Sequence, residues 1–173
     1  MKYTIALILA AALTLVIGGC LMSGQNTFTQ RVEVVAATNT TVTPIPIDLN
    51  EEPDYADNKD NLKSIDELSV VAIITNKLPV PANARLYLSN DATLTTVEEV
   101  EAEATLVFES PAVPASGKLK IGWADGFQYV QNRKVIEDEI FGDGIFMLYA
   151  IAADTPFDLD VKAEIVIVIT AGE

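Results

Sequence analysis

Hydrophobic and polar positions alternate most regularly in the segment FDLDVKAEIVIVIT, at residues 157–170. One face of this alternation is apolar throughout and comprises Phe157, Leu159, Val161, Ala163, Ile165, Ile167 and Ile169. The other face begins with Asp158, Asp160, Lys162 and Glu164 and becomes apolar at Val166 and Val168. A period of two predicts a β-strand with one face on a core and one in water, and the apolar end predicts cover on both faces. Because the segment is long for one strand, we expect a bulge or a bend.

Six further segments show the same alternation or a run of β-branched residues, and they lie at residues 28–37, 68–76, 84–90, 104–110, 117–123 and 144–153. The last of them is apolar on both faces, which is typical of a central strand. Turn-forming Gly, Pro, Asn and Asp residues separate these segments. Helix has only two candidates: one turn at residues 61–68, and a segment at 131–141 that fits either two or three helical turns or an irregular connection. The pattern predicts an all-β fold, an antiparallel β-sandwich with little helix, and leaves immunoglobulin-like and jelly-roll topologies both open.

Composition restricts the chemistry available to this sandwich. The chain has 173 residues, of which 11 are Lys or Arg, 25 are Asp or Glu and none is His, giving a net charge of −14. Such an acidic balance argues against nucleic acid and against a polybasic membrane patch, since both need clustered cations. Without His there is no Ser-His-Asp or Cys-His machinery and no imidazole ligand for a metal. We therefore predict no catalytic residue, no cofactor and no metal site, and a protein that is not an enzyme.

The N-terminus has the pattern of an export signal. Lys2 supplies a positive charge, and the following residues 3–17 are uncharged and mostly apolar. About 15 apolar residues match the hydrophobic region of a signal peptide, whereas a spanning helix needs about 20. Gly18 and Gly19 then place small side chains directly before Cys20, the only cysteine, which excludes a disulfide within the chain.

The tetrapeptide IGGC at residues 17–20 resembles the lipobox of bacterial lipoproteins. The resemblance implies that the Cys20 thiol is diacylglycerated and that the chain is cut before it. Two or three acyl chains then hold the protein at a membrane of the cell envelope. Leu21 stands where an Asp would resemble an inner-membrane retention signal, so the outer membrane is expected if the cell is Gram-negative. An ordinary secretory signal or a membrane anchor with an incidental cysteine is the alternative.

These observations divide the chain into three parts. Residues 1–19 are the expected lipoprotein signal peptide, and residues 20–27 are the lipidated Cys20 and a short tether. Residues 28–173 are long enough for a single β-sandwich domain and short for two.

An acidic segment at residues 47–61 is the first candidate for ion binding. Its side-chain oxygens come from Asp48, Asn50, Glu51, Glu52, Asp54, Asp57, Asn58, Asp60 and Asn61. Calcium takes six to eight such oxygens, but Pro53 interrupts the run and the glycine of an EF-hand is missing. We favour a solvated connection held open by its charges and leave a calcium loop of another kind open.

The second acidic cluster is VEEVEAEA, at residues 97–104. In an extended conformation Glu99, Glu101 and Glu103 would share one face, where like charges destabilise a strand unless they are exposed. We therefore expect a solvent-facing strand edge whose charges prevent aggregation.

Aromatic residues concentrate in GWADGFQY, at residues 122–129. Trp123, Phe127 and Tyr129 lie there together with Asp125. Exposed aromatic rings beside a carboxylate resemble a sugar-stacking platform. The interpretation we favour is a tight hairpin turn at Ala-Asp-Gly with the aromatic rings packed across it.

Three functions fit this sequence. The first is a lipid-anchored envelope protein whose sandwich is structural, adhesive or partner-binding and has no enzymatic activity. The second is a binder of a small or hydrophobic ligand between the sheets, and the least favoured is a hydrolase that uses two carboxylates. The first two are distinguished by the core, because a ligand binder needs a cavity of about 300 Å³ or more. A packed core with an exposed aromatic patch would instead indicate an interaction module.

Overall fold

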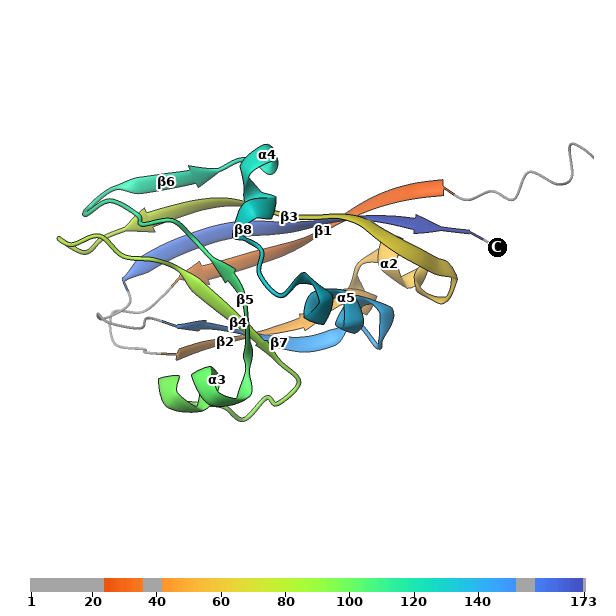
Figure 1. Ribbon diagram of the computed structural model, residues 1–173, viewed down its shortest axis with the longest axis horizontal. Helices are drawn as coiled ribbons and strands as arrows, with labels where there is room; N and C mark the ends of the chain where they lie inside the picture. The colour runs from red at the N-terminus through yellow and green to blue at the C-terminus, as the bar shows by residue number, and fades with distance from the viewer. Residues whose placement is uncertain (1–23, 36–41, 152–157, 173) are drawn as a thin grey trace, which may run out of the picture.

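Two four-stranded antiparallel sheets face each other in the computed structural model, which describes residues 24–35, 42–151 and 158–172 (Figure 1). The strands are β1 (Gly24–Val35), β2 (Val42–Asp48), β3 (Leu62–Asn76), β4 (Arg85–Ser89), β5 (Thr105–Glu109), β6 (Lys118–Ile121), β7 (Ile145–Ile151) and β8 (Leu159–Ala171). One sheet has the order β1-β8-β3-β6, and the other has the order β2-β7-β4-β5. The sandwich prediction is confirmed.

The strand pairing makes this sandwich a jelly roll. β1 pairs with β8, β2 with β7, β3 with β6 and β4 with β5, all antiparallel. The first four strands thus pair with the last four in reverse order, as in one long hairpin. Two further pairings, β3 with β8 and β4 with β7, roll that hairpin into two sheets. Eight strands connected in this way form the jelly-roll fold, which settles the choice of topology.

The alternation at the C-terminus corresponds to β8. Leu159, Val161 and Ile169 of its apolar face are buried against the other sheet. Val166 is also buried, as expected from the apolar end of the second face. The expected irregularity lies in the neighbouring strand, because the register of β3 against β8 shifts between Leu62 and Ser64 and again between Ile65 and Glu67. Strand β7 is central, between β2 and β4, as predicted.

The N-terminal part of the fold differs from the prediction in two respects. β1 begins at Gly24, so the last four residues of the predicted tether are paired with β8. Strand β2 was not predicted, because Pro44 and Pro46 lie in it and proline cannot donate to a ladder. β2 is an edge strand, where a missing N–H can face away from the only partner strand.

The helices are short, and one of them replaces a predicted strand. α5 (Arg133–Phe141) decides for a helix at 131–141, where an irregular connection was the alternative. The turn expected at 61–68 is wrong, since β3 already begins at Leu62 after a 3₁₀ turn, η2 (Lys59–Asn61).

α3 (Val97–Glu103) occupies the second acidic cluster, so the strand edge predicted there is also wrong. The Thr96 hydroxyl accepts from the Glu99 backbone N–H, and the Glu99 carboxylate accepts from the Thr96 backbone N–H. This capping box favours helix over strand. The backbone N–H groups of Thr95 and Thr96 also lower the pKa of Glu99. The spacing Thr-x-x-Glu was the sequence signal for this helix.

Two hydrophobic clusters stabilise the fold. The larger lies between the sheets and includes residues of both, together with Ile136 and Ile140 of α5. The smaller comprises Tyr87, Leu94, Val100, Tyr149 and Ile151, contributed by β4, β7 and the β4–β5 connection that carries α3. The Tyr149 hydroxyl donates to the Asp91 backbone oxygen at 2.6 Å and ties this connection to the sheet.

Candidate functional site

The acidic segment at 47–61 folds into η1 (Leu49–Glu51), α2 (Pro53–Ala56) and η2, so it is not the open connection expected from its charges. Asp48 Oδ1 accepts hydrogen bonds from the Asn50 backbone N–H and side-chain amide, at 2.9 and 2.8 Å. Lys59 Nζ donates to Asn50 Oδ1 at 2.7 Å. Within the part of the chain that the structure describes, no three Asp, Glu, Cys or His residues are grouped to hold a metal ion. The structure gives the calcium hypothesis no site.

A buried tyrosine explains why this segment is folded. Tyr55 of α2 has no exposed surface, and its hydroxyl donates to the Ile140 backbone oxygen in the last turn of α5, at 2.8 Å. Burial raises the pKa of Tyr55, and Asp143 and Asp48 raise it further. Gly144 has a φ of +75°, and a Cβ at this position would lie 2.6 Å from the tyrosine oxygen. Tyr55 therefore closes one end of the sandwich.

Tyr55→Phe should lower the free energy of unfolding by about 1 kcal/mol, because it removes the hydroxyl that satisfies a buried helix-end carbonyl. For a domain of this size that is a fall of about 2–4 °C in melting temperature. Tyr129→Phe is the matched control, since the hydroxyl of Tyr129 makes no hydrogen bond to any described residue, and thermal unfolding of both variants measures the difference. Equal shifts in the two variants would contradict this role for the Tyr55 hydroxyl.

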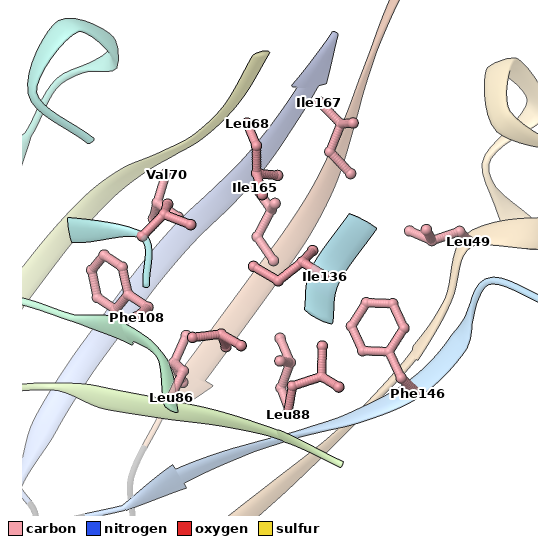
Figure 2. Close-up of a pocket in the computed structure, with 13 residues that line it drawn as sticks. Leu49, Leu68, Val70, Leu86, Leu88, Phe108, Ile136, Phe146, Ile165 and Ile167 are labelled. Atoms are coloured by element: carbon pink, nitrogen blue, oxygen red, sulfur yellow. The ribbon is translucent and has the colours of Figure 1, made fainter. Parts of the chain in front are cut away.

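A small cavity of about 30 Å³ lies between the sheets (Figure 2). It is lined by apolar side chains of both sheets, and Ile136 of α5 points into it, with Ile165, Leu88 and Phe146 around it. For comparison, an engineered apolar cavity that binds benzene has a volume of about 150 Å³. The cavity is therefore too small for a hydrophobic ligand, and the core is packed.

The larger hollow, of about 430 Å³, lies on the surface beside β3. We call it the β3 groove, and its lining residues are Asp66, Glu67, Leu68, Ser69, Trp123, Ala124, Phe127 and Arg133. Trp123 and Phe127 come from α4 (Trp123–Gly126) and the turn that continues it, η3 (Phe127–Tyr129). They are four residues apart, which places both rings on one side of the helical segment. Trp123 is 39% exposed and Phe127 63% exposed.

The helical turn α4 is fixed to β3 by close backbone contact, and Figure 1 shows it lying against the outer side of that strand. Ser69 is buried, and its hydroxyl donates to the Trp123 backbone oxygen at 3.0 Å. Gly126 approaches so closely that a Cβ on it would lie 2.1 Å from the Val70 backbone oxygen. The two aromatic rings are therefore presented on a docked scaffold rather than on a free loop.

A β-bulge supplies the carboxylates of the groove. Ile65 and Glu67 pair with consecutive residues of β8, so Asp66 is the extra residue of the bulge. Ile65 and Leu68 are buried, whereas Asp66 and Glu67 are both exposed. Bulges re-aim side chains in this way, and here two consecutive acidic residues line the same hollow.

Hydrogen bonds orient the carboxylate of Asp66. Its two oxygens accept from the hydroxyls of Ser64 and Thr170, at 2.7 and 2.6 Å. These two bonds hold the carboxylate of Asp66 in one orientation.

Arg133, the first residue of α5, adds a hydrogen-bond donor to the groove. Its Nη2 donates to the Ile65 backbone oxygen at 2.8 Å, and its Nε pairs with the Glu137 carboxylate one turn along the helix. These two contacts hold the guanidinium beside the bulge. The groove therefore combines two aromatic rings, two carboxylates and one guanidinium.

The hairpin interpretation of residues 122–129 is wrong, since the segment is helical and docks on β3. Trp123 and Phe127 are exposed, as the sugar-platform interpretation requires, but Tyr129 is half-buried against the core. Asp125 does not line the groove, and its place is taken by Asp66 and Glu67. No pattern in the sequence pointed to these residues or to Arg133, because they meet the aromatic rings only in the fold.

The predicted lipidation site, Cys20, lies outside the described residues, and its modification stays a prediction. Among the helices that the structure describes, none has the length and hydropathy needed to cross a membrane.

No protein-family model and no curated protein sequence matches the chain. Among solved structures it is similar to a chain titled Desmodium yellow mottle tymovirus, at 9% identity and a TM-score of 0.35, covering 87% of this chain and 89% of that one. It is also similar to a chain of tobacco necrosis virus, at 9% identity and a TM-score of 0.36, covering 87% and 97%. A chain of turnip yellow mosaic virus matches at 11% identity and a TM-score of 0.31, covering 87% and 83%. The strand order of the chain itself identifies the jelly roll, and at these scores nothing about function is carried across.

Proposed function

We propose that this protein is lipid-anchored at the cell envelope through Cys20, and that its jelly roll is a non-enzymatic module that binds a partner in the β3 groove. One observation supports binding above the other functions. The core is packed around a cavity of about 30 Å³, whereas the surface groove of about 430 Å³ exposes two aromatic rings. Ordinary ligand sites have volumes of about 300–1,000 Å³.

The placement of the groove carboxylates supports binding without hydrolysis. A glycosidase needs two carboxylates on opposite sides of the bond that it cleaves, one of them a proton donor. Asp66 and Glu67 are consecutive residues of one strand, and both line the groove. Asp66 also accepts a hydrogen bond on each oxygen, which is the pattern of an acceptor.

The strand register of the sheet β1-β8-β3-β6 supports the proposal that the groove lies close to the lipid on Cys20. Ala171 of β8 pairs with Gly24 on one side and Leu62 on the other, and Val168 pairs with Thr27 and Glu67. Glu67 is therefore three residues of β8, about 10 Å, from the level at which β1 begins. Four peptide links join Cys20 to Gly24 and reach at most about 14 Å. A lipid on Cys20 would hold the groove near the membrane surface, where an envelope component is within reach.

Photocrosslinking in native membranes tests the groove as the binding surface. A photoreactive amino acid at Ala124, which is exposed in the groove, should give a discrete crosslinked product. The same group at Ala115, exposed outside the groove in the β5–β6 connection, is the matched control and should give none.

Combining the Ala124 probe with Phe127→Ala should reduce the crosslinked product about tenfold, the effect of removing an aromatic anchor. Products of equal yield at the two positions, or no product at Ala124, would contradict the proposal.

A further inference from the structure

We infer that the β3 groove binds a neutral saccharide chain, with its rings against Trp123 and Phe127. This inference rests on the proposed function, since it names the chemistry of the partner that the groove would hold. It is argued from three features of the groove: the exposed aromatic pair, the mixture of donors and acceptors around it, and the blocked edge of β3.

The aromatic pair provides a flat apolar surface at an otherwise polar site. Trp123 and Phe127 keep 39% and 63% of their surface exposed although both are held on a docked helical turn. Aromatic faces are large apolar surfaces with a negative quadrupole. The face of a sugar ring that carries C–H groups, which are weakly positive, is complementary to such a surface. Two rings four residues apart can accept consecutive units of one chain.

The polar groups of the groove match hydroxyls rather than a single charge. Asp66 and Glu67 provide acceptors, and Arg133 provides donors. A sugar hydroxyl is both a donor and an acceptor, so it can use either kind of group. The bonds that fix Asp66 and Arg133 to Ser64, Thr170 and Ile65 hold these groups in place before a ligand arrives. Preorganised groups lose little entropy on binding.

An added peptide strand fits this edge of β3 poorly. β6 pairs only with Ala72–Thr75, so no described strand pairs with the earlier part of β3 on that side. However, Arg133 already binds the Ile65 oxygen, and Gly126 lies against the Val70 oxygen. The four residues between these two obstacles are fewer than the five or six of an ordinary strand.

A cationic ligand also fits less well. Ammonium groups bind over aromatic faces, and two nearby carboxylates would favour them. Arg133 lines the same hollow, and its N–H groups need an acceptor, which an ammonium group lacks. A neutral ligand with hydroxyl groups can use both the donors and the acceptors of the groove.

The fluorescence of Trp123 provides a direct test, because it is the only tryptophan in the chain. The full chain, in a detergent without a sugar headgroup, is screened on an array of neutral and N-acetylated oligosaccharides. Each oligosaccharide that binds is then titrated while the emission is recorded. We expect a saturable change in emission for at least one of them, and binding that changes less than twofold between 50 and 500 mM salt.

Phe127→Ala should weaken saccharide binding about tenfold or more, as expected for an aromatic anchor. Phe141→Ala is the matched control, because Phe141 is 48% exposed and does not line the groove, so binding should be unchanged. Trp123→Ala lacks the fluorophore, so its saccharide binding is measured by calorimetry, and we expect it to be weakened as well.

Two other outcomes separate this inference from the proposed function. If no oligosaccharide binds in a Phe127-dependent manner while the Ala124 crosslink still forms, the saccharide inference is overturned and the binding function stands. The same holds if tetramethylammonium or a lysine-rich peptide binds instead, with affinity that falls steeply as salt rises. If neither a ligand nor a crosslink is found, both proposals are wrong.

Discussion

Cys20→Ser should abolish both the lipidation and the cleavage of the chain. Without the thiol no diacylglycerol can be attached, and the lipoprotein signal peptidase, which cuts only lipidated chains, should leave residues 1–19 in place. We expect loss of metabolic labelling with a radioactive fatty acid and a chain longer by the uncut signal. Because stable anchoring needs two or more acyl chains, carbonate extraction should free any chain that is cut by another peptidase.

Leu21→Ala is the matched control, since it changes the neighbouring position and keeps the thiol. It should be labelled, cut and retained in the membrane as the parent chain is. If the Cys20→Ser variant were still labelled and normally processed, the lipid-anchor prediction would be wrong, and so would the envelope part of the proposed function. The binding part would stand, because the β3 groove lies wholly within the described jelly roll.

Among substitutions that add a single methyl group, Gly126→Ala should disturb the groove most. The added Cβ would lie 2.1 Å from the Val70 oxygen and 2.6 Å from the Ser69 hydroxyl oxygen. The first of these is backbone in the middle of β3, so α4 must move away from the strand. Overpacking of this kind costs about 1–3 kcal/mol, which lowers the melting temperature of a domain of this size by about 2–12 °C.

The same displacement should change the environment of Trp123, whose backbone oxygen accepts from Ser69. We expect a red shift of the tryptophan emission in the folded state and a matching loss of the Ala124 crosslink. Gly122→Ala is the control, because no described atom beyond the two chain neighbours lies within 4 Å of a Cβ at Gly122, and its φ of −87° suits any residue. Equal melting temperatures and emission spectra for the two variants would show that α4 is not docked as described.

The sequence predicted most strands from periodicity, and the reason is local. Alternation such as that of β8 indicates which face of the strand is buried, and burial of one face follows from the hydrophobic effect alone. The same reasoning failed at β2, where Pro44 and Pro46 are acceptable only because the strand is at an edge. It also failed at α3, where the Thr96–Glu99 capping box outweighs the apparent alternation of charge.

The groove could be predicted only in part. The exposed aromatic residues Trp123 and Phe127 were visible as a cluster, but Tyr129 and Asp125 were wrongly grouped with them. The carboxylates that do line the groove lie more than fifty residues earlier in the chain. Their side chains point to one side because of a β-bulge. A bulge depends on how β3 is aligned with β8, so it cannot be recognised from the sequence of β3 alone.

The sequence alone determined the class of fold, the acidic surface, the exclusion of histidine chemistry and the expectation of a lipid on Cys20. These follow from composition and from short-range patterns, which depend on neighbouring residues only. The tertiary structure decided the jelly-roll order, the closing of one end by Tyr55, the packed core and the groove beside β3. Each of these depends on which distant segments meet. The hydrophobic pattern determines which face of a strand is buried, but packing and register determine which strand it pairs with.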